Sequence, residues 1–174
     1  NEIAVLANKQ KEKEIPEFGY SQPKPFGGCP GTAAKEFAPK KEQPMFTRGN
    51  SAIESQITNW PVQIKLVPVK SPYFDGANLL IAADCTAFSY GNFHNEFLKN
   101  HKAVIGCPKL DRVDYSEKLT QIIALNDIKS VKIVKMEVPC CNGLLNAAKK
   151  ALQDSGKFIP WQIVTISTDG KILD

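Results

Sequence analysis

Residues 78–85 read NLLIAADC, a near-continuous apolar run that ends in a cysteine. A run of this length without polar alternation is typical of a strand buried on both faces, as in a parallel sheet. Similar apolar segments lie before and after it, separated by stretches in which apolar residues recur at helical spacing. The alternation predicts an α/β domain with a largely parallel sheet and helices on both of its faces.

Working outward from this run, we expect five strands and four helices. The other predicted strands are 62–69, 102–107, 130–138 and 161–167. The predicted helices lie between the capping residue Ser51 and Pro61, over 91–100, after the capping pair Asp114 and Glu117, and over 142–153.

The first 50 of the 174 residues differ in composition from the rest. They hold six of the twelve prolines and five of the eleven glycines, which prevents long regular elements. We therefore expect an extended arm over 1–50, which carries Cys29, and a folded domain over 51–174. The chain begins with Asn1 rather than methionine, which suggests a fragment or a processed product.

Composition and charge exclude several classes of function. The net charge of +4 is mild and spread along the chain, and 20 of the 22 basic residues are lysine, so we expect no nucleic-acid partner. There is no apolar run of roughly 18 residues, as a membrane span requires, and no secretory signal pattern. We therefore expect a cytoplasmic protein that does not enter a membrane.

The five cysteines are the unusual feature. An odd count without a secretory signal argues against a disulfide framework. Cys85, Cys107 and the pair Cys140–Cys141 each follow a predicted strand, and parallel strands end at the same edge of a sheet, where open α/β sheets bind ligands. Cys29 lies between glycines in the arm, which allows close backbone approach to a bulky group. The pattern predicts a shared site for these thiols.

Soft sulfur ligands select iron–sulfur clusters, Zn²⁺ or Cu(I). Structural zinc sites use close cysteine pairs on turns, whereas a four-iron cluster accepts ligands from several strand ends, which favours the cluster. The amino end of the helix over 142–153 would face its negative charge. Two alternatives stay open: a zinc-stabilised structural or interaction module, and a metal-free thiol–disulfide protein that uses Cys140 and Cys141.

Several segments together resemble a known family. They are GGCPGTAA, NWPVQIKLVP, PYFDGANLLIAADC, FHNEFL, GCPKLD and MEVPCCNGLL, within roughly residues 27–173. They are similar to the C-terminal domain of ferredoxin-like iron–sulfur proteins of anaerobic bacteria and archaea. The resemblance implies a 4Fe-4S cluster and a redox partner such as a ferredoxin or a ferredoxin module. The four-cysteine motif of that module is absent here.

These observations predict a three-layer α/β domain with a mostly parallel, five-stranded flavodoxin- or Rossmann-like sheet and an irregular N-terminal arm. The expected function is electron transfer at a cluster held by Cys29, Cys85, Cys107, Cys140 and Cys141, with substrate reduction as an extension. If the protein is an enzyme, it is an iron–sulfur oxidoreductase. His94, Glu137 and Lys109 are candidates for proton transfer or charge compensation beside the cluster.

Overall fold

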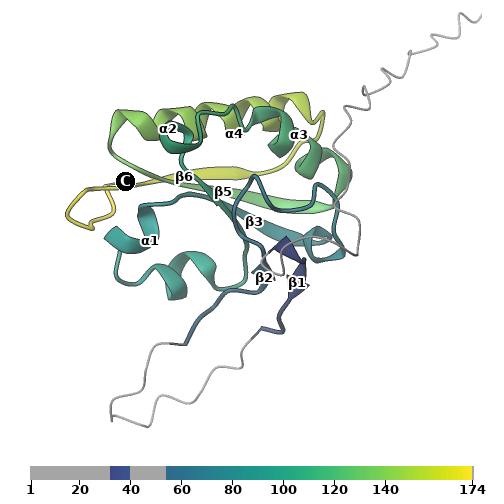
Figure 1. Cartoon of the computed structure of the whole chain (residues 1–174), viewed down its shortest axis with the longest axis horizontal. Coiled ribbons are helices and arrows are strands. Elements are labelled where there is room, and N and C mark those ends of the chain that lie inside the picture. Colours follow the sequence, from purple (N-terminus) through teal and green to yellow (C-terminus); the bar gives the residue numbers. More distant parts are fainter. Residues whose placement is uncertain (1–31, 40–53, 174) are drawn as a thin grey trace, which may run out of the picture.

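The computed structural model describes residues 32–39 and 54–173 (Figure 1). Within them, a parallel sheet has the strand order β4-β3-β5-β6, and a small antiparallel sheet pairs β1 with β2. The parallel strands are β3 (Ala77–Ala83), β4 (Lys102–Gly106), β5 (Ile128–Met136) and β6 (Trp161–Ile166). The predicted α/β class with a parallel sheet is confirmed.

The centre of the sheet is buried on both faces, as the apolar run at 78–85 predicts. Leu79, Leu80 and Ile81 are consecutive in β3 and are all fully buried, although successive side chains of a strand point to opposite faces. Ile81 lies beside Ile133 of β5, which is also fully buried. Burial on both faces explains why this strand lacks the polar alternation of a half-exposed one.

The parallel sheet has four strands among the described residues, so the prediction of five is wrong. Residues 62–69 turn instead of extending, since the Leu66 and Val67 N–H groups both donate to the Gln63 carbonyl. They meet the sheet only through an isolated bridge between Gln63 and Ile105 of β4. Pro61 and Pro68 bracket the segment, and proline cannot donate to a strand ladder.

The helix predicted between Ser51 and Pro61 is also wrong over its described part, residues 54–60. Its last two residues instead form β2 (Asn59–Trp60), which pairs with β1 (Lys35–Glu36). The buried Asn59 side chain explains the difference. Its Oδ1 accepts from the Ala103 N–H at 2.8 Å and its Nδ2 donates to the Ala103 carbonyl at 3.0 Å, so it ties this segment to β4.

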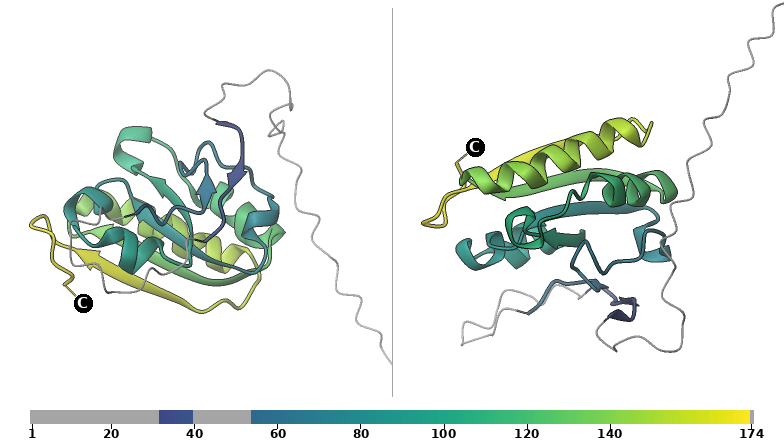
Figure 2. Two further views of the ribbon diagram at one scale, coloured as in Figure 1. Left: turned by 90° about the horizontal axis from the view of Figure 1, so that it is seen from below. Right: turned by 45° about the horizontal axis from the view of Figure 1, so that its top comes forward.

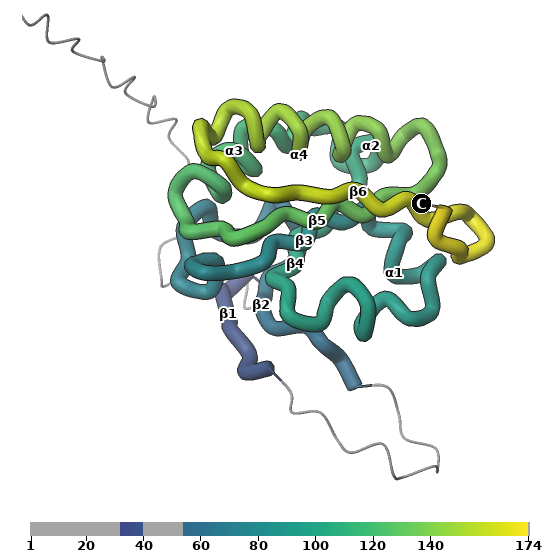
Figure 3. Tube along the Cα trace, turned by 180° about the vertical axis from the view of Figure 1, so that it is seen from behind, coloured from purple at the N-terminus to yellow at the C-terminus, as the bar shows by residue number. Residues whose placement is uncertain are grey.

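Helices cover both faces of the sheet and give three layers. Figures 1 and 3 show α2, α3 and α4 on one face, and α1 with the short helix His94–Leu98 on the other. In Figure 2, right panel, the small β1–β2 sheet lies on the side of the parallel sheet away from α4. No helix in the described ranges has both the length and the apolar character needed to cross a membrane. The helices are α1 (Thr86–Ser89), α2 (Pro108–Asp111), α3 (Ser116–Leu125) and α4 (Asn142–Asp154).

Candidate thiol site

Four cysteines gather where β3, β4 and β5 end, and we call this part of the sheet its carboxyl edge. Cys85 lies two residues beyond β3, and Cys107 directly follows β4. Cys140 and Cys141 lie in a 3₁₀ turn, Pro139–Cys141, after β5. Because β3 lies between β4 and β5 in the sheet, these strand ends are neighbours. All four thiols are free; Cys85 and Cys140 are exposed, and Cys141 is buried. Cys29 lies outside the described residues.

Cys140 and Cys141 are placed by the start of α4. Cys141 is the residue before α4, and the first turn of α4 contains no acidic residue, so no carboxylate offsets the positive end of the helix dipole. The Cys140 thiol is close enough to that of Cys141 to raise its pKa. Burial raises the pKa of Cys141, the Met136 backbone lowers it through a hydrogen bond, and the Cys140 and Cys85 thiols raise it. The Cys85 thiol is thus near enough to act on Cys141.

Cys107 is held by the turn between β4 and α2. The Asp111 N–H donates to the Cys107 carbonyl at 2.9 Å. The next residue, Pro108, lies against Gly143 in the first turn of α4, where a Cβ on the glycine would be 3.1 Å from the proline Cβ. This packing brings the Cys107 turn to the same helix start that carries Cys140 and Cys141.

Tyr115 contacts the turn that follows Cys107. Its hydroxyl donates to Asp111 Oδ2 at 2.5 Å, and its ring is buried. Burial and the bond to Asp111 both raise the pKa of Tyr115, with further contributions from Asp84 and Cys107, so the hydroxyl stays protonated as a donor. Tyr115 therefore fixes the position of Asp111 and, through it, of the Cys107 turn.

Gly106 leaves room for this tyrosine. A Cβ added to Gly106 would lie 2.7 Å from the Tyr115 hydroxyl oxygen and 2.8 Å from the ring carbon that bears it. We expect Gly106→Ala to lower the free energy of unfolding by about 1–3 kcal/mol, the usual effect of overpacking a buried site. Urea denaturation measures the change.

Gly91→Ala is the matched control, because a Cβ at Gly91 meets nothing within 4 Å. We expect it to change the free energy of unfolding by less than about 0.5 kcal/mol. Equal effects of the two substitutions would contradict the contact between Gly106 and Tyr115.

Asp84 adds a carboxyl group beside Cys85. Gln63 Nε2 donates to its Oδ1 at 3.4 Å. Partial burial raises the pKa of Asp84, the bond from Gln63 lowers it, and the charge of Asp111 raises it. The carboxyl edge thus combines four thiols with two carboxyl groups and a buried tyrosine.

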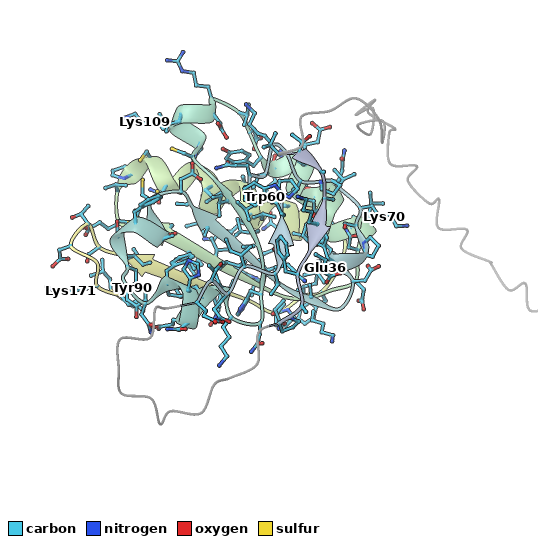
Figure 4. The ribbon with its side chains drawn as sticks, turned by 60° about the horizontal axis from the view of Figure 1, so that its bottom comes forward. Glu36, Trp60, Lys70, Tyr90, Lys109 and Lys171 are labelled. Atoms are coloured by element: carbon cyan, nitrogen blue, oxygen red, sulfur yellow. The ribbon has the colours of Figure 1, made fainter. Side chains whose placement is uncertain are left out.

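The three side chains predicted to assist chemistry have other contacts. His94 Nδ1 accepts from the Gln56 N–H at 3.1 Å. Glu137 Oε1 accepts from the Thr168 N–H at 2.7 Å and from its hydroxyl at 3.0 Å. Lys109 is exposed on α2 and extends away from the body of the molecule (Figure 4). These contacts give His94 and Glu137 roles in holding loops, and a catalytic role for any of the three stays a prediction.

Tyr115 is not among the residues that the sequence predicts for this site. Its position depends on a tight turn at Arg112, which has a φ of 51° in the left-handed region. No residue pattern around Arg112 predicts that turn. The one signal was Gly106 at the end of a strand, because a glycine there often marks a close approach of another group.

The described residues do not form a single-ion site. No group of three or more His, Cys, Asp or Glu side chains within 32–39 and 54–173 is placed to hold one metal ion. The thiols come from three adjacent strands, which stand about 4.8 Å apart. A tetrahedral zinc ion, with Zn–S bonds of about 2.3 Å, requires its sulfurs to converge on one point.

Comparisons with known proteins give the family of the fold. A family model described as a Rossmann-like domain matches residues 71–174. An uncharacterized protein of Archaeoglobus fulgidus is 36% identical over 103 residues, which cover 59% of this chain and 72% of the relative. No solved structure matches.

These findings correct the resemblance drawn from the sequence. Membership of the ferredoxin-like 4Fe-4S proteins is wrong, because the matching family model is a Rossmann-like domain and the relative has no assigned function. The segments that carried the resemblance are largely strand ends and the turns after them. Such segments recur in many parallel α/β sheets, so their order alone does not separate one family from another.

Proposed function

Because the chain belongs to the Rossmann-like domain family, we propose that the carboxyl edge of its sheet is the functional site and that it binds an iron–sulfur cluster for electron transfer. The observation that carries this proposal is the convergence of four free thiols at three adjacent strand ends. Ligands of open α/β sheets bind at this edge. The Rossmann-like fold supports this location for a site, and the thiols support a soft-metal or redox chemistry.

The donor set suits a cluster better than a single ion. Thiolates are the usual ligands of iron–sulfur clusters, and a cluster spreads its ligands over several iron atoms. A cluster can therefore take ligands from the ends of β3, β4 and β5, whereas structural zinc sites usually take close cysteine pairs on turns. When bound, the cluster would accept and donate single electrons. Cys85, Cys107 and one or both of Cys140 and Cys141 would hold it, and Cys29 stays a predicted ligand.

The residues around the thiols have distinct roles in this proposal. The start of α4 directs backbone N–H groups and a partial positive charge toward the edge, which stabilises anionic thiolates. Tyr115 and Asp111 position Cys107. The buried Cys141 is the more protected thiol of its pair and the exposed Cys140 the more accessible one.

The partner in this proposal is another electron carrier, which docks at the carboxyl edge. A cytoplasmic location is part of the same proposal, since thiols stay reduced in that compartment. Substrate reduction at the cluster, as an iron–sulfur oxidoreductase, would be an additional activity of this edge.

The adjacent positions of Cys140 and Cys141 in the turn before α4 favour one other function. Two adjacent thiols at a helix start can be oxidised to a disulfide and reduced again without a metal. In that case Cys85 and Cys107 take no part, and substitution of either leaves the redox activity unchanged.

Anaerobic production of the chain tests the proposal. We expect about four iron atoms and four sulfides per chain and a broad absorbance near roughly 400 nm that weakens on reduction with dithionite. Iron, zinc and acid-labile sulfide are measured together. A colourless protein that holds stoichiometric zinc, or one that takes up no iron under reconstitution, would contradict the cluster.

A further inference from the structure

Within the described residues, the parallel sheet ends on one side in a strand, β6, that has no outer neighbour (Figure 3). Val131 of β5 donates its N–H to the Pro160 carbonyl at 3.0 Å, and Glu137 donates to the Ile166 carbonyl at 2.9 Å. The backbone groups of alternate residues in a strand point to opposite sides. The even-numbered residues of β6 therefore face β5, and the odd-numbered residues direct their N–H and carbonyl groups away from the sheet.

The outward side of β6 is covered at its carboxyl end only. There the chain folds back, and Leu173 donates its N–H to the Thr165 carbonyl at 2.9 Å. Toward the amino end, the backbone groups of Trp161 and Ile163 have no outward partner in the part of the chain that the structure describes. Unpaired donors and acceptors on an edge strand form a template for pairing with another strand.

An apolar hollow opens beside this edge, on the face of the sheet that α4 covers. It has a volume of about 320 Å³ and lies between the end of α4 and the residues that lead into β6. Its apolar surface comes from Leu152, Ile159, Phe158 and Trp161. The Phe158 side chain is fully exposed and that of Trp161 is 46% exposed. Exposed aromatic side chains that line one hollow are typical of an interaction surface.

The surroundings of this edge are basic. Lys149 and Lys157 line the hollow, and the Lys149 ammonium lies 5.8 Å from the centre of the Trp161 ring. No Asp or Glu occurs over 155–168 or within β5, and β5 carries three lysines. Asp154, at the end of α4, is not among the residues that line the hollow. Carboxylates of a partner are therefore attracted to this side of the sheet.

A second copy of this chain does not suit the edge. Pairing of β6 with β6 of a copy brings Lys149 and Lys157 of both chains to one interface, and 155–168 has no carboxylate to offset them. Like charges across paired strands are destabilising, and lysines near an edge strand oppose self-association. An extended segment that carries carboxylates meets attraction instead of repulsion at the same place.

We propose that the open edge of β6 binds an extended, acidic segment of a partner protein, which adds a strand to the sheet. The segment pairs with the backbone groups of Trp161 and Ile163, and one of its apolar side chains enters the hollow beside Phe158. Carboxylates two residues before and after that side chain lie on the same face, near Lys149 and Lys157. Backbone bonds supply the affinity in this mode of recognition, and the side-chain contacts supply the specificity. The surface does not involve the cysteines, so it stands or falls separately from the proposed electron transfer.

Fluorescence anisotropy with a fluorescein-labelled peptide, GETFTEG, tests this surface on the full chain. Its two glutamates flank the phenylalanine at the spacing that puts all three side chains on one face of a strand. We expect saturable binding. The peptide GKTFTKG, in which lysines replace the glutamates, should bind about tenfold more weakly or worse, because attraction to the two lysines of the chain becomes repulsion.

Amide hydrogen exchange distinguishes strand addition from contact by side chains alone. The bound peptide should slow exchange of the outward N–H groups of Trp161 and Ile163, whereas the Gln162 N–H, which faces β5, should keep its rate. Ile163→Pro removes an outward N–H without removing a bond to β5, so it should weaken peptide binding by about threefold or more. Circular dichroism checks that this variant is folded, and the exchange measurement on the wild type does not depend on it.

Lys150→Gln is the matched control for Lys149→Gln. The two lysines are adjacent in α4, but Lys150 lines a different hollow together with Asp114. We expect Lys149→Gln to weaken binding of GETFTEG by about threefold and Lys150→Gln to leave it unchanged.

Four outcomes would overturn the proposal. They are no saturable binding of GETFTEG, no slowing of exchange at Trp161 and Ile163, equal effects of Lys149→Gln and Lys150→Gln, and tighter binding of an oligouridylate than of the peptide. A chain that is a dimer by sedimentation, with these two amides already protected without peptide, would likewise assign the edge to a second copy and contradict the proposal.

Discussion

We expect Cys85→Ser to remove most of the iron that the proposed cluster brings to the anaerobically prepared protein. Serine keeps the size and the polarity of the residue but has no thiolate, which is the group that binds iron. Cys85 follows the central strand of the three that contribute thiols, so the other proposed ligands follow the strands on both sides of it. We expect the iron content to fall from about four atoms per chain to a small fraction of that value, with loss of the absorbance near roughly 400 nm.

Ser89→Ala controls for disturbance of α1, because Ser89 ends the short helix that begins beside Cys85. It should keep the full iron content, and circular dichroism of both variants should match the wild type. Iron that persists in Cys85→Ser at the wild-type level would exclude Cys85 as a ligand. The same measurement on Cys140→Ser and Cys141→Ser separates the roles of the pair.

We expect Ile133→Ala to lower the free energy of unfolding by about 2–5 kcal/mol. Ile133 is fully buried in β5, which lies between β3 and β6. Water therefore cannot enter the space that a shorter side chain leaves. The loss combines the transfer free energy of the removed methylene and methyl groups with the cavity that they leave. Urea denaturation followed by circular dichroism measures it.

Ile172→Ala removes the same atoms from an isoleucine that is 36% exposed and takes part in a backbone bridge with Ile166. It should cost less than half as much, because the bridge does not depend on the side chain. A small effect of Ile133→Ala, similar to that of Ile172→Ala, would mean that β5 is not the centre of the core.

The strands could be predicted because a strand buried on both faces has apolar residues at successive positions in the sequence. Within the run at 78–85, residues 79–83 are apolar at successive positions, and the structure buries all five on the two faces of β3. The convergence of Cys85, Cys107 and Cys140 followed from topology alone, since parallel strands end together. That part of the site required no knowledge of side-chain contacts.

The errors lie where long-range contacts override local pattern. Residues 62–69 have the composition of a strand, but the turn at Gln63 prevents them from extending. The segment before Pro61 has helical spacing, yet the bonds of Asn59 to Ala103, 44 residues away, hold it extended. Tyr115 depends on the backbone at Arg112 in the same way. None of these contacts is visible in a single sequence.

The parallel arrangement of the strands has a consequence for the order of events during synthesis. Neighbouring strands are far apart in the chain; Asn78 and Ser130, which share a hydrogen bond, are separated by 52 residues. Such pairings form slowly, because long loops must close before they yield stabilising contacts. The thiols of Cys85, Cys107, Cys140 and Cys141 are therefore brought together only once β3, β4 and β5 have paired.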